Sequence, residues 1–165
     1  MRIPAVHTYQ RTLSDTESRR LKSKLPWLGK RRQELLTDIE QRLIHVYEFD
    51  VLRSWDINGC RPPCCPYTYL FQTSDDLYVY VETWEEFERR ENSGSRLVIE
   101  STPTTRMLVK ATLEGTIALE DDEKLRELNE FFELYSGEWR AWKEHELPAN
   151  VLIILGGLTL SSSKG

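Results

Sequence analysis

The chain of 165 residues has the length of one globular domain. Hydrophobic residues make up 39% and charged residues 30% of it, and the mean hydropathy is -0.52. These values exclude an integral membrane protein and a wholly disordered chain. We therefore expect a single soluble domain over residues 1–165, with residues 161–165 as a frayed tail.

Apolar runs and cysteines bear on the cellular compartment. No apolar run near the start of the chain has the length of a signal peptide, and the longest one, residues 151–155, is too short to span a membrane. The three clustered cysteines, Cys60, Cys64 and Cys65, make a poor disulfide framework. Because such a framework suits oxidising compartments, both observations predict a cytoplasmic protein.

Charge is distributed unevenly along the chain, which has a formal net charge of -5. The first 32 residues contain nine basic and two acidic side chains, whereas the remainder is acidic. A basic segment of this kind either contacts an anionic ligand, a nucleic acid or a lipid surface, or forms a solvated helix face against the acidic body. Nucleic acid is the less favoured partner because the acidic body repels phosphate. Peripheral membrane contact is also disfavoured because Pro26 and Gly29 interrupt the interfacial helix.

Two helices are expected in the first 55 residues. Ser14 and Glu17 have the spacing of a capping box, which predicts a helix from Asp15 to near Leu25. Apolar residues then recur every three or four positions, which predicts a second helix from residue 30 to about residue 45 and favours its continuation towards residue 55. The apolar faces of these helices are small, so residues 1–55 should dock on the rest of the chain.

The middle of the chain has the pattern of strands. Three prolines within residues 58–66 predict an irregular loop. Alternating side chains over residues 67–73 and 77–83, with a polar turn between them, predict a β-hairpin. Residues 84–92 are read as a short helix or a charged excursion. Further strands are expected over residues 96–101, 106–113 and 116–119.

A helix with an acidic start is predicted from Asp121 to about Tyr135, because an apolar stripe follows the acids and Gly137 follows the stripe. A second short helix is considered over residues 138–145, and the branched run at residues 151–155 predicts a buried strand. The order of elements predicts an α+β fold. We expect a mainly antiparallel sheet of five to six strands over residues 66–160, with two N-terminal and one or two C-terminal helices packed on it.

A metal site is one hypothesis for the cysteine cluster. Thiolates and imidazole are the ligands that zinc prefers, so Cys60, Cys64 and Cys65 could hold zinc with His45. The second closely spaced ligand pair of a structural zinc site is missing, which favours a packed or surface loop instead. A loop with a modified or redox-sensitive thiol is a further alternative.

Other patterns offer little for catalysis. The chain has no glycine-rich phosphate loop and no nucleophile elbow. Lone histidines such as His145 are more typical of surface or core positions than of a catalytic base. Residues 101–106 form a hydroxyl-rich stretch that ends in Arg106. This stretch suits either turn chemistry or the binding of a phosphate or carboxylate.

Aromatic residues of the hairpin could form a binding platform if they share one exposed face, and they belong to the core if a helix covers them. The sequence therefore favours a non-enzymatic protein-interaction or regulatory module with a protein partner. Its alternatives are a metal- or thiol-dependent protein at the cysteine loop and anionic-ligand contact through the basic segment. The residues expected to contact a partner are Tyr67, Tyr69, Tyr78, Tyr80, Trp84, Arg19, Arg20, Arg31 and Arg32.

Overall fold

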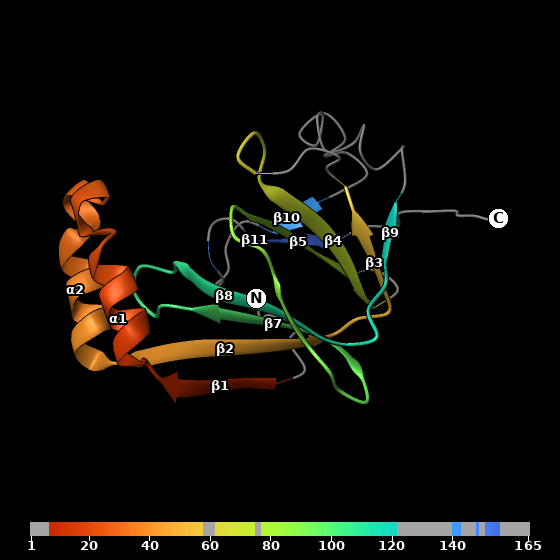
Figure 1. Cartoon of the computed structure of the whole chain (residues 1–165), viewed down its shortest axis with the longest axis horizontal. Coiled ribbons are helices and arrows are strands. Elements are labelled where there is room, and N and C mark those ends of the chain that lie inside the picture. Colours follow the sequence, from red (N-terminus) through yellow and green to blue (C-terminus); the bar gives the residue numbers. More distant parts are fainter. Residues whose placement is uncertain are drawn as a thin grey trace.

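The computed structural model describes residues 7–57, 62–74, 77–121, 140–142, 148 and 151–155. In this part of the chain, two sheets pack face to face and two α-helices lie across one end of the first sheet (Figure 1). The architecture is α+β, as expected. Strands predominate over helices, however, and they form two mixed sheets instead of the one mainly antiparallel sheet of five to six strands that was expected.

Sheet A has the strand order β1-β2-β7-β8-β6. Its neighbours pair antiparallel, except that β6 runs parallel to β8. The strands are β1 (His7–Thr12), β2 (Leu43–Asp50), β7 (Ser95–Ser101), β8 (Leu108–Gly115) and β6 (Glu88–Arg90).

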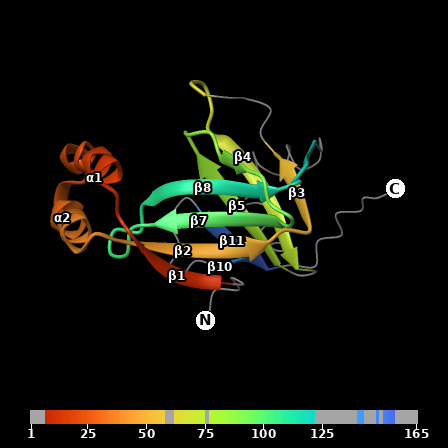
Figure 2. The same ribbon diagram turned by 60° about the horizontal axis from the view of Figure 1, so that its bottom comes forward.

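Sheet B has the strand order β10-β11-β5-β4-β3-β9, again antiparallel except for the pair β3 and β9. Its centre is the hairpin of β4 and β5, which confirms that prediction. Figure 2 shows the strands of sheet A crossing in front of those of sheet B. The strands are β10 (Arg140–Trp142), β11 (Val151–Leu155), β5 (Leu77–Thr83), β4 (Tyr67–Ser74), β3 (Arg53–Asp56) and β9 (Leu119–Asp121).

The main core lies between the sheets. Alternation along each strand directs one set of side chains inward. In this set, Phe71 lies opposite Val79 in sheet B, and Ile99 lies opposite Tyr47 in sheet A. All four are at most 1% exposed. Phe87, from the connection that follows β5, packs its ring on Phe71 at a centroid distance of 6.0 Å.

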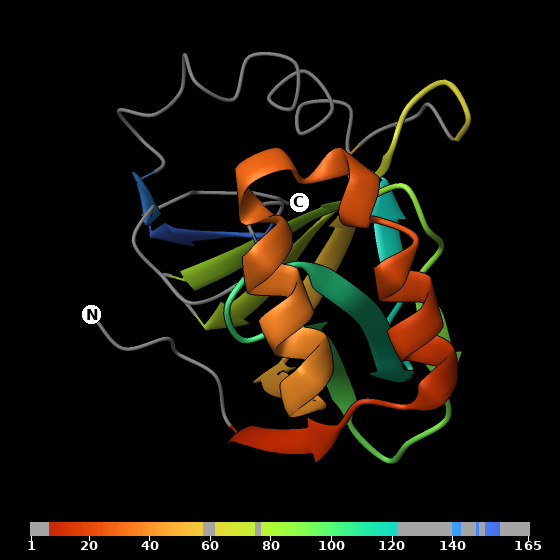
Figure 3. The same ribbon diagram turned by 90° about the vertical axis from the view of Figure 1, so that its left-hand side faces the viewer.

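The helices cover part of the outer face of sheet A. Helix α1 (Asp15–Lys22) starts at the predicted capping box: the Glu17 amide donates to Ser14 Oγ at 3.2 Å, and the Ser14 amide donates to Glu17 Oε1 at 3.0 Å. Two 3-10 turns, η1 (Leu25–Trp27) and η2 (Gly29–Arg31), lead into α2 (Arg32–Gln41). Figure 3 shows both helices in front of the sheet. Their contact with the sheet is an aliphatic cluster of Leu13, Leu21, Leu35, Ile39, Ile44, Val46 and Val98.

The predicted continuation of the second helix to residue 55 is wrong. The helix stops at Arg42, which has a left-handed backbone with φ 55°, and β2 follows immediately. This strand is buried on both faces: Ile44 and Val46 face the helices, whereas Tyr47 and Phe49 face the sheet–sheet core. A strand buried on both sides loses the simple alternation of apolar and polar residues, so its sequence imitates helical spacing.

Other boundaries also differ from the expectation. The predicted strand over residues 106–113 lies at 108–115, residues 116–118 are outside any strand, and residues 88–90 form β6 rather than a helix. Residues 140–142 are a strand and not part of a short helix. The helix expected from Asp121 to Tyr135 lies outside the described residues except at Asp121, which ends β9. The tail at 161–165 and residues 58–61 of the predicted loop lie outside them as well.

Gly115 ends β8 in a conformation that other residues rarely adopt, with φ 89°. A Cβ atom built there would lie 1.3 Å from the carbonyl oxygen of Gly94. Only glycine fits this close approach of two backbones. In the described part of the chain, no helix combines the length and the apolar character needed to cross a bilayer.

Candidate functional site

A cleft of about 530 Å³ lies between the helical layer and the connection that joins β5 to β6. Residues 105–111, from the β7–β8 turn and the first half of β8, line it from below. One side is basic and consists of Arg20, Lys24, Arg31 and Arg106, whereas the other is acidic and consists of Glu82, Glu85, Glu86 and Glu88.

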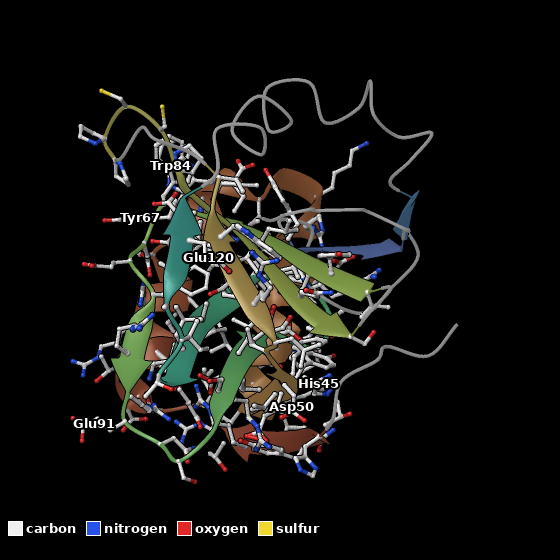
Figure 4. All side chains as sticks on the ribbon, turned by 90° about the vertical axis from the view of Figure 1, so that its right-hand side faces the viewer. His45, Asp50, Tyr67, Trp84, Glu91 and Glu120 are labelled. Carbon is white, nitrogen blue, oxygen red and sulfur yellow. The ribbon has the colours of Figure 1, made fainter. Side chains whose placement is uncertain are left out.

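Trp84 lies on the acidic side of the cleft and is 58% exposed. It follows β5 directly, where the Thr83 hydroxyl accepts a hydrogen bond from the Glu85 amide at 3.2 Å. This short turn takes the chain out of the sheet and leaves the indole at the surface. Figure 4 shows Trp84 beside Tyr67 at one end of the molecule, with His45 and Asp50 at the other.

Arg31 holds the basic side to the β7–β8 turn. Its Nη2 donates to the Thr105 carbonyl at 2.6 Å, and its Nε lies 3.1 Å from Glu34 Oε2. Lys24 follows α1, and Arg106 has a left-handed backbone with φ 52° at the turn. Two segments that are distant in sequence, residues 20–31 and the turn at Arg106, therefore bring their cations to one side of the cleft.

Asp38 fixes the same turn from helix α2. Its carboxylate accepts hydrogen bonds from the Thr104 amide at 2.9 Å, the Thr105 amide at 2.9 Å and the Thr105 hydroxyl at 2.7 Å. The side chain is buried, with the residue 1% exposed. Within the hydroxyl-rich stretch at 101–106, two backbone amides and one hydroxyl thus bind a carboxylate that belongs to the protein itself.

Ion pairs connect the acidic side to the rest of the cleft. Glu85, in the connection between β5 and β6, forms an ion pair with Arg20 of α1 across the cleft. Both side chains are at least half exposed. Glu88 Oε2 lies 2.8 Å from Lys110 Nζ, and this hydrogen bond lowers the pKa of the Glu88 carboxyl below its ordinary value. Exposed pairs of this kind contribute little to stability, so a charged partner can replace them at small cost.

The structure brings three of the predicted contact residues together, because Arg20, Arg31 and Trp84 all line the cleft. Arg19 and Arg32 are exposed but lie outside its lining.

The predicted tyrosine platform is not present as one exposed face. Strand register places Tyr69 opposite Val81 and Tyr80 opposite Leu70, so the tyrosines of β4 and β5 point to opposite faces of sheet B. Tyr69 packs in the sheet–sheet core, and Tyr78 and Tyr80 are 1% and 8% exposed. Tyr67 is half-buried against the same core. The covered alternative is therefore the one that the burial supports.

The residues proposed to hold zinc do not meet in the described part of the chain. Cys65 is in a disulfide bond, contrary to the expectation for this cluster, and Cys64 is an exposed free thiol. Cys60 lies outside the described residues. His45 is on β2, with its Nε2 3.2 Å from Gln10 Nε2, at the opposite end of the molecule from Tyr67 (Figure 4). Among the described residues, no cluster of three His, Cys, Asp or Glu side chains is arranged to hold a metal ion.

A second hollow, of about 450 Å³, lies beside β1 on the outer face of sheet A. Arg11 bridges two carboxylates there: its Nη1 donates to Glu17 Oε1 at 2.8 Å and its Nε to Glu100 Oε1 at 2.5 Å. These hydrogen bonds raise the pKa of the Arg11 guanidinium and lower that of Glu17 to about 2. The arginine is saturated by the protein's own acids, so its role here is structural.

Sequence reasoning missed the acidic side of the cleft and Asp38. Glu85, Glu86 and Glu88 were visible as a charged run, and their proximity to Trp84 was the available signal. Asp38 gave no signal, because its partners are 66 and 67 residues away in the chain. Comparison of the chain with protein-family models, curated proteins and solved structures finds no match.

Proposed function

We propose that this protein is an interaction module whose cleft binds an extended segment of a partner protein. The observation that carries the proposal is Trp84, which is 58% exposed on the side of a 530 Å³ cleft. Water contact with so large an aromatic surface is unfavourable, and tryptophan is among the residues that contribute most to binding at protein interfaces.

The surroundings of Trp84 fit a peptide better than a compact apolar ligand. Met107 and Leu108 supply apolar surface to the same cleft, whereas the two sides of the cleft have opposite charge. Such an arrangement selects a partner by the order of its charges as well as by its apolar contacts. Asp38 and Arg31 hold the β7–β8 turn from the helical layer, so the backbone on this side of the cleft need not be ordered when a partner binds.

The proposal is tested by selecting binders from a random peptide library displayed on phage. The recovered peptides should bind the Trp84→Ala protein at least about tenfold more weakly, measured by surface plasmon resonance. Trp27→Ala is the matched control, because Trp27 is 86% exposed and lies outside the cleft. It should change the affinity less than twofold. Failure to recover binders, or equal effects of the two substitutions, would overturn the proposal.

A further inference from the structure

Among the residues that the structure describes, the first half of β8 is an open sheet edge. β6 pairs with β8 only at Thr112–Glu114, opposite Glu88–Arg90. Along Leu108–Ala111, no described strand lies on that side of β8, although β7 pairs with it on the other. Because alternate residues of a strand direct their N–H and C=O groups to opposite sides, about half of this stretch presents backbone groups to the cleft.

The open edge has the dimensions of a peptide site. Four residues of strand span about 13 Å at roughly 3.3 Å per residue, and all four line the cleft. Leu108, Val109 and Lys110 are only half-buried. A β-bulge at Val109, where two residues of β8 face one of β7, increases the local twist of this stretch.

The two faces of an added strand would contact different kinds of side chain, basic on one face and apolar on the other. Helix α1 covers the outer face of sheet A, so one set of alternate side chains would face Arg20 and Lys24. Trp84 follows β5 of sheet B, so the other set would face the indole and the inward-directed Leu108. Acidic side chains suit the first set and apolar side chains the second.

From the open edge and this charge arrangement, we infer that the partner segment binds as an additional strand of sheet A along Leu108–Ala111. Its residues alternate between acidic side chains, which face α1, and apolar side chains, which face Trp84. This inference rests on the proposed function and specifies how the cleft binds its partner. The acids on the other side of the cleft, Glu85 and Glu86, repel acidic side chains in the inward positions and so fix the register.

The bulge has a second consequence. Irregular edges disfavour indiscriminate strand pairing, so backbone hydrogen bonds alone should give little affinity. The alternating side-chain pattern is therefore required for binding, and peptides of the same composition in another order should not bind.

The first experiment measures the affinity of a fluorescein-labelled hexapeptide of alternating glutamate and valine by fluorescence anisotropy. We expect it to bind at least about tenfold more tightly than a peptide of three glutamates followed by three valines, and than the alternating lysine–valine peptide. Arg20→Glu combined with Lys24→Glu should weaken binding about tenfold. Arg19→Glu, on the same helix but outside the cleft, is the control and should change it less than twofold.

The second experiment tests strand addition itself. Two versions of the alternating peptide carry N-methyl groups on the backbone, one on the glutamates and one on the valines. Only one set of amides faces β8, so one version should bind at least about tenfold more weakly than the other. Equal affinities of the two N-methylated peptides would overturn the inference. Equal affinities of the alternating peptide and of the peptide with three glutamates followed by three valines would also overturn it.

The outcomes separate the two proposals. One outcome is that the selected peptides bind in a way that depends on Trp84, while affinity depends on neither the alternation nor the position of the N-methyl groups. This result would support the interaction module and overturn strand addition. A single-stranded oligonucleotide of six phosphates serves as a polyanion without a peptide backbone. If it binds as tightly as the alternating peptide and also depends on Arg20 and Lys24, the cleft is an anion site and strand addition is wrong.

Discussion

The contact between the two sheets and the contact between the helices and sheet A are both apolar, yet different side chains build them. The sheet–sheet core contains five aromatic residues, Tyr47, Phe49, Tyr69, Phe71 and Phe87, together with aliphatic ones. The helix-side cluster is wholly aliphatic and about half as large. Large rings bury more surface per residue, so the sheet–sheet core should provide most of the stability.

Polar contacts compensate for the small size of the helix-side cluster. The capping box begins α1, Arg11 joins α1 to sheet A through Glu17 and Glu100, and Asp38 joins α2 to the β7–β8 turn. These contacts are directional, whereas apolar burial is not. The helical layer is therefore positioned by hydrogen bonds, and this layer supplies the basic side of the cleft.

The largest effect is expected in the sheet–sheet core. Phe71→Ala removes a ring that is fully buried and lies 6.2 Å from Tyr69 and 6.0 Å from Phe87, centroid to centroid. The substitution should lower the free energy of unfolding by about 4 kcal/mol, measured by urea denaturation. Leu52→Ala, at a leucine that is 61% exposed, is the control and should have little effect. Similar values for the two would contradict the assignment of the core.

A smaller effect is expected where hydrogen bonds hold the helical layer. Asp38→Ala leaves the amides of Thr104 and Thr105 and the Thr105 hydroxyl without their acceptor. Because these groups are wholly or partly buried, the free energy of unfolding should fall by about 3 kcal/mol. Glu40→Ala changes an exposed acid on the same helix and should leave it nearly unchanged. Equal stability of the two variants would show that the turn does not depend on Asp38.

The contact between α1 and sheet A should be sensitive to pH. The Arg11 guanidinium lowers the pKa of Glu17 from 4.5 to about 2, so its folded-state pKa lies below the unfolded value. The stability from this group is present above pH 4.5 and is lost as pH falls towards 2. Near pH 6, wild type should be about 2 kcal/mol more stable than Glu17→Gln, and the difference should shrink to near zero at pH 2. Parallel stability profiles of the two proteins over this range would rule the contribution out.

The smallest effect is expected at Thr112, on the outer face of sheet A opposite Val98. This threonine is fully buried, and its Oγ1 has no hydrogen-bond partner among the described residues. Thr112→Val removes this unpaired hydroxyl and keeps the shape, so it should raise the free energy of unfolding by about 1 kcal/mol. The free energy of unfolding is measured by thermal denaturation. Thr116→Val, at an exposed position, serves as the control. A loss of stability in Thr112→Val would mean that the hydroxyl is satisfied in solution.

Short sequence patterns were sufficient to predict the elements that depend mainly on residues close together in the chain. The Ser14 capping box, the hairpin of β4 and β5 and the strand at residues 151–155 all follow from short patterns, and the structure confirms them. β1 escaped prediction because its residues are mostly exposed and polar, and it is a strand only because β2 pairs with it. Tertiary contact overrides sequence pattern in such edges.

The cleft residues also show what sequence patterns can predict and what they cannot. Arg20, Arg31 and Trp84 were recognised individually from charge and aromatic character, but nothing in the sequence places them at one site. Their meeting depends on the Asp38 hydrogen bonds and on the path of the chain after β5, which are set by residues far apart in sequence. Composition therefore drew attention to individual residues that line the cleft, and only the fold brings them together.

The close approach of Gly115 to the Gly94 carbonyl has a consequence for tracing the evolution of this protein. Any other residue at position 115 would collide with the backbone of the preceding connection, so descendants that keep this packing must keep glycine there. A distant homologue can diverge almost everywhere on its surface and still carry this mark at the end of β8. An alignment of candidate relatives should be accepted only where it places a glycine in that column.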